Sequence, residues 1–416
     1  MRWLTEKDIR NKLSNKNYDI RTMNKEKVRF ADQKCTPDVL CIVCDCILDY
    51  IEQNGNDYFS AKDIWMSDYA INNVKNIFKK PDLTNESAKS EYDKFFPQPM
   101  ELLAFAGVLE LDIDKYRKSK RNFYRVADET MLTFIAIREI NAVEFLNVFM
   151  ERVLTDSGIF QYFESFFERQ DNTSLQTARA KFIEFIHNYT NIEGDYEPKR
   201  IFPKVLNPMC FKRNIRGIED GNITSNIVTM TILTYNKDNF RDIYLEKPKG
   251  MTRKEYVDEN HITIRDELTE YQVMKAKRLL RMYNDEFKGG ISEINDGTES
   301  TEYASEMHHI FPKNEFPTIK AFIENLIALT PTQHRNYAHV IDKVTNYKII
   351  NRDYQYLCLI NKSSHIEENL LNEEYKIYDF SKFKEVLATG LDNDSFYDIE
   401  EMDFNEINRM IEIYYN

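Results

Sequence analysis

The sequence predicts a predominantly helical α+β protein that is divided into several domains. Apolar residues recur at spacings of three and four over long stretches, as in amphipathic helices, whereas strand-like runs are few and short. The chain of 416 residues has only 11 glycines and 11 prolines, which argues against a turn-dense β-sandwich. At one domain per roughly 150 residues, this length predicts two to four domains.

Composition excludes several classes of protein. Hydrophobic residues make up 42% of the chain and aromatic residues 13%, which is enough to bury real cores, so general disorder is excluded. We find no run that could span a membrane and no apolar signal core at the N-terminus. Six cysteines in so long a chain do not form a disulfide scaffold. We therefore expect a cytoplasmic protein without membrane association.

Residues 1–128 have the order of elements that is typical of a winged helix. Helical stretches are expected from Pro37 to Ile51, after a cap at Ser60, and up to Gly107. A strand, a basic turn and a second strand follow in the runs VLELDI, DKYRKSKRN and FYRVAD. Several helices followed by a hairpin predict a winged-helix-like region that recognises DNA.

Two basic runs are candidates for contacts with DNA. The turn of the expected hairpin could place its cations against a phosphate backbone or in a minor groove. A second run, over 199–216, has six basic residues and no acidic one. A solvated surface would explain either run as well, because charge runs are common on wet faces. The candidate residues are Lys118, Lys120, Arg121, Lys212, Arg213 and Arg216.

Four further regions differ in sequence texture. Residues 129–195 have helical periodicity and predict a helical connector, which could also pair two subunits into a homodimer. Residues 196–300 form a mixed basic region with possible DNA contacts and a strand-like run, NIVTMTILTY, at 226–235. Residues 301–345 contain most of the histidines. Residues 346–416 predict an acidic helical segment that packs against the region before it.

Two weaker constellations compete for the functional site. Four cysteines near the N-terminus could suggest zinc, but three of them lie in the apolar run LCIVCDCILDYI, so we expect buried core cysteines. Asp38, together with Glu197 and Lys199, superficially resembles the carboxylate-and-lysine motif of another nuclease class. About 160 residues separate its two parts, and it stays open as a rival active site.

The histidines of the chain are strongly clustered. Four of the seven fall between 308 and 339. The segment MHHIF predicts a short strand that ends at Pro312, and NLIALT predicts a second strand. Thr330 and Pro331 then supply a cap and a first-turn proline for a helix, TQHRNYAHVIDKV.

Two strands and a helix could bring three histidine side chains into one site. His308 and His309 would lie beside His334, in the first turn of the helix. Because adjacent residues on a strand point to opposite faces, one of the paired histidines can face a metal and the other a substrate. His339 is five residues beyond His334, so we expect an ordinary helix residue on another face. This division suits metal-assisted hydrolysis of a phosphodiester.

At these positions the chain resembles the HNH, or ββα-metal, nuclease family. HHIFP at 308–312 matches the opening [D/H]-H-x-x-P of the family, Asn325 matches its central asparagine, and His334 matches its closing histidine. The match covers about 40 residues. The first position is more often Asp in the family. Many relatives also have C-x-x-C pairs that bind a structural zinc, where this chain has Thr330 and Gln333.

The resemblance implies a role for each matched residue. His309 would be the general base that activates water. His308 and His334 would be ligands of one divalent metal, with Mg²⁺ expected and Mn²⁺ possible. Asn325 would fix the loop so that the base faces the scissile phosphate. The resemblance therefore implies a ββα-metal catalytic module.

The implied function is hydrolysis of phosphodiester bonds in double-stranded DNA by a metal-dependent endonuclease. Lys313 and Arg335, beside the motif, are further candidates for phosphate contacts. A long N-terminal portion with recognition elements is similar to a type II restriction endonuclease, which implies a cognate DNA methyltransferase in a bacterial defence system. The alternatives are a modification-dependent or phage-defence nuclease, a structural metal site, and a winged-helix DNA-binding regulator without catalysis.

Overall fold

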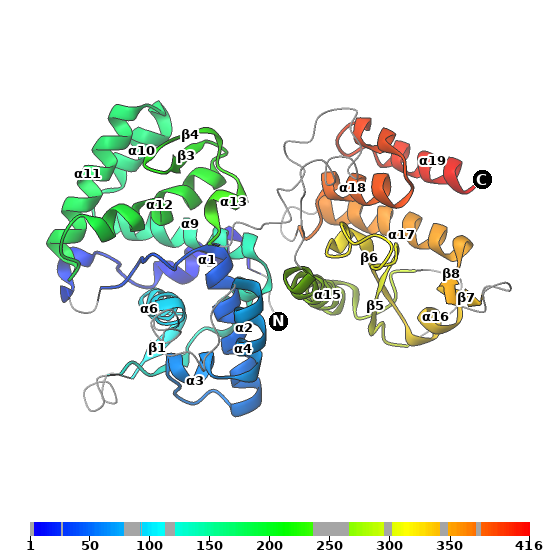
Figure 1. Ribbon diagram of the computed structural model, residues 1–416, viewed down its shortest axis with the longest axis horizontal. Helices are drawn as coiled ribbons and strands as arrows, with labels where there is room; N and C mark the ends of the chain where they lie inside the picture. Colours follow the sequence, from blue (N-terminus) through cyan, green and yellow to red (C-terminus); the bar gives the residue numbers. More distant parts are fainter. Residues whose placement is uncertain are drawn as a thin grey trace. The chain divides into compact units, whose positions relative to one another are not determined.

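The computed structural model of the chain forms two compact units (Figure 1). The N-terminal unit is Trp3–Lys249 and the C-terminal unit is Gly250–Asn416. The described part of the chain is predominantly helical, and its strands form two-stranded antiparallel sheets, in keeping with an α+β protein. The structure describes residues 4–25, 28–78, 92, 94–112, 121–235, 266–294, 302–341, 348–371 and 376–416.

The first half of the N-terminal unit has helices followed by a hairpin, in the order that the sequence predicts. Ser60 begins α3 by accepting a hydrogen bond from the Asp63 backbone N–H, and Gly107 ends α6 in the left-handed region with a φ of 85°. β1 and β2 pair with Glu110 opposite Arg125. The elements are α1 (Glu6–Ser14), η1 (Ile20–Thr22), α2 (Pro37–Asn54), α3 (Ala61–Trp65), α4 (Asp68–Phe78), α6 (Pro97–Ala106), β1 (Leu109–Leu111) and β2 (Tyr124–Val126).

The second half of this unit is almost entirely helical. The predicted periodicity corresponds to separate helices α8 and α9, because Arg138 between them is extended, with φ −156° and ψ 152°. The two-stranded hairpin β3–β4 follows α12. The elements are α8 (Glu129–Ile137), α9 (Glu139–Asp156), α10 (Phe160–Arg169), α11 (Asn172–Tyr189), α12 (Tyr196–Lys212), β3 (Arg216–Glu219), β4 (Asn222–Ile227) and α13 (Met230–Leu233).

The strand expected at 226–235 is wrong for most of its length. β4 ends at Ile227, and the next residues form the single helical turn α13. Met230 and Leu233, three residues apart, are both buried in this turn, which packs on α12. Burial of two side chains on one face of a turn therefore overrides the strand propensity of the β-branched residues around them.

The core of the N-terminal unit lies where α2 packs against α8 and α9. Cys41, Cys44 and Cys46 are buried in α2 and form no disulfide, so the prediction of core cysteines is confirmed. Phe145 and Phe149 of α9 stack with ring centroids 5.6 Å apart. Its packing against α8 and α9 makes α2 a central, apolar helix.

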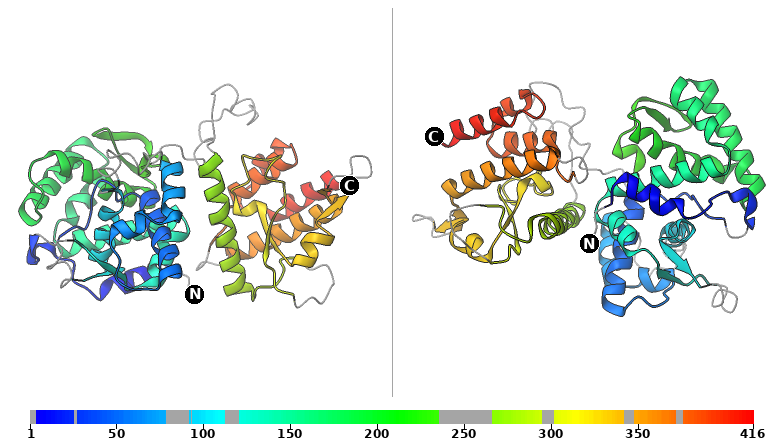
Figure 2. Two further views of the ribbon diagram at one scale, coloured as in Figure 1. Left: turned by 60° about the horizontal axis from the view of Figure 1, so that its bottom comes forward. Right: turned by 180° about the vertical axis from the view of Figure 1, so that it is seen from behind.

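The C-terminal unit is built around the hairpin of β5 and β6. Figures 1 and 2 show α15 on one side of this hairpin and α17, α18 and α19 on the other. The predicted helical C-terminal region is confirmed. The elements are α15 (Asp266–Lys288), β5 (Glu306–His309), η4 (Ile323–Asn325), β6 (Leu326–Leu329), α16 (Pro331–Asn336), β7 (His339–Ile341), β8 (Lys348–Ile350), α17 (Arg352–Leu371), α18 (Phe380–Gly390), η5 (Asp394–Asp398) and α19 (Phe404–Tyr415).

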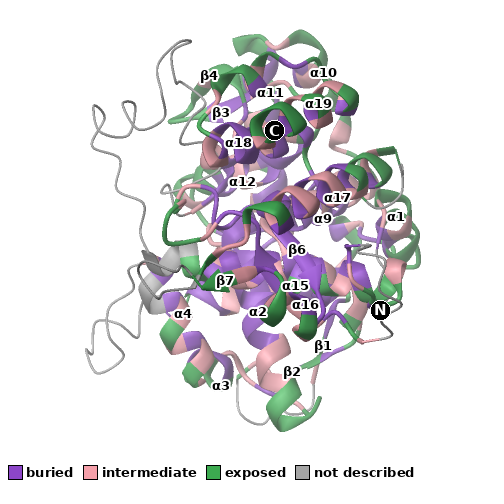
Figure 3. Cartoon of the chain, turned by 90° about the vertical axis from the view of Figure 1, so that its right-hand side faces the viewer, coloured by how far each residue is buried: buried purple, intermediate pink, exposed green. Residues whose placement is uncertain are grey.

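The hairpin is the buried centre of this unit. All four residues of β6 are buried, as Figure 3 shows for the strand as a whole. His308 lies opposite Ile327 and His309 opposite Leu326 in the antiparallel register. Both strands that the sequence predicts around the histidines are therefore confirmed. Among the described residues, no helix is both long and apolar enough to cross a membrane.

Candidate functional site

Three histidine side chains from three different elements meet in the C-terminal unit. His308 is on β5, His334 is on α16 and His339 is the first residue of β7. One ring nitrogen from each lies within 4.8 Å of the others. The ring centroids of His308 lie 5.0 Å from those of His334 and 5.3 Å from those of His339, and the last two are 5.4 Å apart. We call this triangle the three-histidine cluster.

The start of α16 positions His334. The Thr330 hydroxyl accepts a hydrogen bond from the Gln333 backbone N–H at 3.1 Å, and the Gln333 side chain accepts one from the Thr330 N–H at 3.1 Å. Pro331 occupies the first helical position. This reciprocal capping box and the proline start the helix at the predicted residue. His334 therefore lies at the end of the first turn and reaches the cluster.

The helix is shorter than the sequence predicts, and the assignment of His339 as an ordinary helix residue is wrong. α16 ends at Asn336, and β7 then pairs antiparallel with β8, with His339 opposite Ile350. Val340 and Ile341, which follow His339, are β-branched and suit a pleated strand better than a helix. That composition is the signal that could have revealed the third histidine of the cluster.

The surroundings of the cluster favour metal binding. Burial, with smaller effects from the neighbouring histidines, lowers the pKa of His308 to about 3. A neutral imidazole keeps the lone pair that a metal ligand needs. Glu306, two residues before His308 on β5, places a carboxylate oxygen 3.7 Å from Nδ1 of His334. Carboxylates that hydrogen-bond to imidazoles often orient metal ligands, and at 3.7 Å this carboxylate lies just beyond hydrogen-bond distance. Sequence reasoning did not identify Glu306 as a site residue.

His309 points away from the cluster and has a different environment. Its Nε2 lies 2.9 Å from the carbonyl oxygen of Lys320. Because a carbonyl can only accept a hydrogen bond, Nε2 carries the proton and Nδ1 keeps a lone pair. Burial lowers the pKa of His309 to about 4, and Lys277 and Lys313 contribute in the same direction. The side chain is therefore neutral near pH 7 and can accept a proton at Nδ1.

Asn325 ties together the loop that follows β5. The side chain is fully buried, and its Oδ1 accepts a hydrogen bond from the Phe311 N–H at 2.9 Å. Its Nδ2 donates to the carbonyl oxygens of Phe311 at 3.1 Å and Ile319 at 3.4 Å. The Asn325 carbonyl also accepts from the Ile310 N–H at 2.9 Å. One side chain thus joins both ends of the loop, next to the strand residue His309.

A buried ion pair between Glu293 and Lys362 is bonded to β6. The Glu293 carboxylate accepts hydrogen bonds from the Ala328 N–H at 2.6 Å and from the Lys362 ammonium at 2.7 Å. The Glu293 N–H donates to the Ala328 carbonyl at 2.9 Å. Lys362 also donates to the Tyr378 hydroxyl at 2.9 Å. Each charge is therefore paired, which is the condition for burying it. This ion pair therefore helps to hold β6, the strand that pairs with His308 and His309 of β5.

The candidate phosphate contacts of the C-terminal unit lie near the motif. Lys313 is exposed and forms an ion pair of 3.3 Å with Glu270 on α15. Arg335 is exposed on α16, near the negative charge of Glu302. Both side chains are accessible to a phosphate. A contact by either stays a prediction.

Two basic candidates of the N-terminal unit form ion pairs within that unit. Lys212 forms an ion pair with Glu144. Arg213 forms an ion pair of 2.8 Å with Glu151 and lies over the ring of Phe167. Both side chains therefore help to join α12 to α9. DNA contact by them stays a prediction.

Of the remaining basic candidates, Arg216 begins β3 and Arg121 precedes β2. Arg216 donates to the Gln170 carbonyl at 2.9 Å. Arg121 is exposed shortly before β2. Lys118 and Lys120, in the turn of the expected wing, lie outside the described residues. The wing hypothesis therefore stays a prediction.

Two residues of the rival carboxylate-and-lysine motif have structural interactions at the starts of helices. Asp38 is buried in the first turn of α2, where its carboxylate accepts hydrogen bonds from the Thr36 hydroxyl at 2.7 Å and from the Tyr235 N–H at 2.9 Å. Lys199, in the first turn of α12, forms an ion pair of 3.3 Å with Asp195. These contacts support the starts of α2 and α12.

The histidine site combines a set of metal donors with a separate proton acceptor. Three imidazoles leave coordination positions open for water or substrate, as in catalytic metal sites, whereas a closed structural zinc site has four protein ligands. Imidazole nitrogen suits Zn²⁺ and other transition ions better than Mg²⁺. No protein-family model, no curated protein and no solved structure matches this chain. Its function must therefore be inferred from the chemistry of the site.

Proposed function

We propose that the chain is a metal-dependent endonuclease of the HNH class that hydrolyses phosphodiester bonds in double-stranded DNA. One observation carries this proposal. His308, which belongs to the three-histidine cluster, and His309 are adjacent residues of β5. A candidate metal site and a proton acceptor therefore occupy neighbouring positions. β5, β6 and α16 would form the ββα-metal module. Asn325, which ties down the adjoining loop, completes the residues of the motif.

Each residue has one task in the proposed reaction. His309 accepts a proton at Nδ1 from the attacking water, whose oxygen forms a bond to phosphorus as the bond to the 3′ oxygen breaks. The Lys320 carbonyl holds the base in the required tautomer. Asn325 keeps the loop in place around it. A divalent ion, when bound by His308 and His334 with His339 as a third ligand, supplies charge stabilisation at the leaving oxygen.

The metal is the part of the proposal on which resemblance and donor chemistry differ. The HNH resemblance implies Mg²⁺ or Mn²⁺, while three imidazole donors favour softer divalent ions such as Zn²⁺. The neighbouring Glu306 carboxylate adds an oxygen donor near His334. Glu306 is not one of the grouped ligands, so the first experiment compares Mg²⁺, Mn²⁺ and Zn²⁺.

For the N-terminal unit we propose DNA recognition. Its helices α2 to α6 followed by the β1–β2 hairpin support a winged-helix-like region, by order of elements. Together with a nuclease site, this supports a sequence-specific type II restriction endonuclease that acts with a cognate DNA methyltransferase. A homodimer would let the two sites cut both strands.

The test is a digest of plasmid and phage DNA by the purified protein. Reactions contain Mg²⁺, Mn²⁺, Zn²⁺ or EDTA, and the variants His309→Ala and His187→Ala run beside the wild type. His187 is in the N-terminal unit, on α11, and is the matched control. We expect discrete bands that require metal and His309 and that persist in His187→Ala. The loss through His309→Ala should reach orders of magnitude in rate while DNA binding persists.

The other outcomes are equally informative. A smear would indicate a nonspecific nuclease. Cutting of methylated or glucosylated DNA alone would indicate a modification-dependent enzyme. DNA binding without cutting under any condition would contradict the nuclease and favour the DNA-binding regulator.

A further inference from the structure

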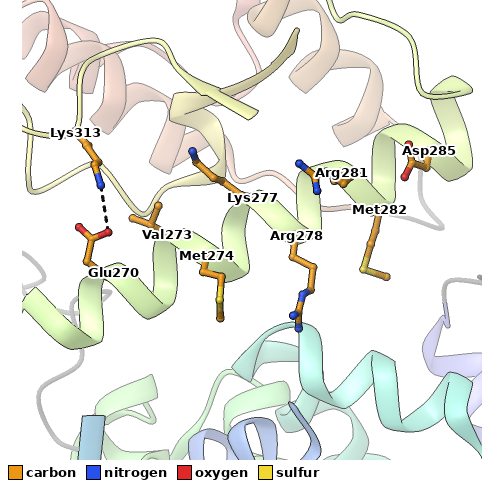
Figure 4. A pocket seen from close by; sticks show the side chains of 9 residues that line it. All are labelled: Glu270, Val273, Met274, Lys277, Arg278, Arg281, Met282, Asp285 and Lys313. Carbon is orange, nitrogen blue, oxygen red and sulfur yellow. Dashed lines mark hydrogen bonds and ion pairs between the residues drawn. The ribbon is translucent and has the colours of Figure 1, made fainter. Parts of the chain in front are cut away.

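A pocket of about 480 Å³ lies along α15 in the C-terminal unit (Figure 4). Lys277 and Arg281, one helical turn apart, extend from the same side of α15, and Lys313 approaches that side from the loop after β5. Arg278 extends from the other side of the helix. Three cations from two segments therefore gather at one face of the pocket. We call Lys277, Arg281 and Lys313 the α15 cationic group.

The acids of the pocket neutralise this group only in part. Glu270 already accepts from two lysines, Lys313 at 3.3 Å and Lys320 at 3.2 Å. Asp285 accepts a hydrogen bond from the Tyr303 hydroxyl at 2.7 Å. Among the described residues, Lys277 forms no ion pair or hydrogen bond. Positive charge is therefore in excess at this face of α15.

The charge is partly withdrawn from water. Lys277 is half-buried, and burial lowers its pKa, with the nearby charges of Lys313 and Arg281 acting in the same direction. Glu306 and Glu270 oppose this effect. An ammonium group that loses hydration beside other cations is stabilised by an anion. The pocket is therefore a favourable place for an anion to bind.

The group lies next to the site histidines. Lys277 acts electrostatically on both His308 and His309, and Lys313 acts on His309. Arg281 donates a hydrogen bond of 2.7 Å to the Ser305 carbonyl, just before β5, which fixes one side of its guanidinium. An anion held here would therefore lie beside β5 and close to the proposed base.

We propose that Lys277, Arg281 and Lys313 form a subsite for a backbone phosphate of the DNA strand that His309 serves. This inference rests on the proposed nuclease function and names the part of the site that grips the substrate. Neutralised phosphates release counterions, so each contact contributes to affinity without reading sequence. The subsite would hold the strand in register while the cluster and His309 act on a neighbouring phosphodiester.

The test measures binding of a short fluorescein-labelled DNA duplex by anisotropy, in EDTA and over a range of salt concentrations. The variants are Lys277→Gln and Arg281→Gln. Lys288→Gln is the matched control, since Lys288 is a lysine of the same helix that pairs with Glu368 outside the pocket. Thermal melting of every variant checks that the fold persists.

We expect each subsite variant to bind about fivefold more weakly at about 0.15 M salt and to lower the salt-dependence slope by about one. Lys288→Gln should keep the wild-type affinity and slope. If the wild type binds and cuts DNA and both subsite variants match it, the subsite is wrong and the nuclease stands. A wild-type protein that binds no duplex in any salt overturns the subsite and the proposed function together.

Discussion

Two adjacent histidines acquire different chemistry because they share a strand. His308 faces two other imidazoles, while His309 faces the Lys320 carbonyl. The alternation of side chains along β5 thus places the proposed metal ligand and the proposed proton acceptor on adjacent residues. Substituting one of them should therefore impair one task and leave the other.

Glu324 is a buried carboxyl group beside this site whose titration affects stability. Burial raises its pKa to about 7, from an ordinary value of 4.5, against hydrogen bonds from backbone N–H groups that include the one of Asp379. Lys382 also lowers the pKa, and the charge of Asp379 raises it. Between these two pH values the folded protein keeps a proton that the unfolded chain has released.

The stabilisation from protonated Glu324 is fully present below about pH 4.5 and is lost as the pH rises through about 7. The loss is about 1.4 kcal/mol for each unit of pKa difference. We expect Glu324→Gln, which stays neutral and keeps an acceptor for the Asp379 N–H, to remove this decline. Urea unfolding at a series of pH values measures it. Glu400→Gln, at an exposed position, should keep the wild-type decline, and an unchanged decline in Glu324→Gln would contradict the assignment.

At the scale of elements, one loop and one hairpin build the site. The loop after β5 positions His309, and Asn325 joins its two ends. The β7–β8 hairpin brings His339 back to β5. Buried apolar side chains, among them Phe311, Ile319 and Phe322, also hold the loop.

Removal of the Asn325 side chain should destabilise the C-terminal unit. Asn325→Ala leaves the buried Phe311 N–H and carbonyl without their partner, at a cost of roughly 2 to 4 kcal/mol. Chemical denaturation measures the free energy of unfolding. Asn361→Ala is the control, because the Asn361 side chain donates to Leu357 of its own helix at a partly exposed position. Its effect should stay within about 0.5 kcal/mol. Equal costs for the two variants would show that Asn325 does not hold the loop.

At the scale of the whole molecule, chemistry and recognition are assigned to different units. All the residues of the three-histidine cluster and the proposed base are in the C-terminal unit. The winged-helix-like order of elements is in the N-terminal unit. A ligand of the cluster should therefore stabilise one unit selectively.

Metal binding should protect the C-terminal unit from hydrogen exchange. The three ligands come from β5, α16 and β7, so one ion would join three segments. At a metal concentration of about 100 times the Kd, the added stability is about 2.7 kcal/mol. Hydrogen exchange with mass spectrometry, with Zn²⁺ or Mn²⁺ and after EDTA, resolves the two units.

We expect slower exchange in β5, α16 and β7 and no change in α8 to α12. The variant His339→Ala should lose most of this protection, and His187→Ala should keep it. Equal protection of both units, or full protection in His339→Ala, would contradict a three-ligand site.

Much of the fold follows from local signals. The capping residues Ser60 and Thr330 start their helices where expected, and Gly107 ends α6. The two strands around the histidine pair were predictable from their alternation and from Pro312. The strand expected at 226–235 failed because packing of Met230 and Leu233 on α12 outweighs local propensity.

The sequence by itself determined the helical α+β class and the two strands β5 and β6, and it supplied the candidate residues His308, His309, Asn325 and His334. These depend on periodicity, caps and motif order within about 30 residues. Only the tertiary structure brought His339 and Glu306 to the cluster and Lys277 beside the histidine pair. The reason is physical: such neighbours are set by how β7 folds back and how α15 packs on β5, and these contacts join segments that local sequence patterns describe separately.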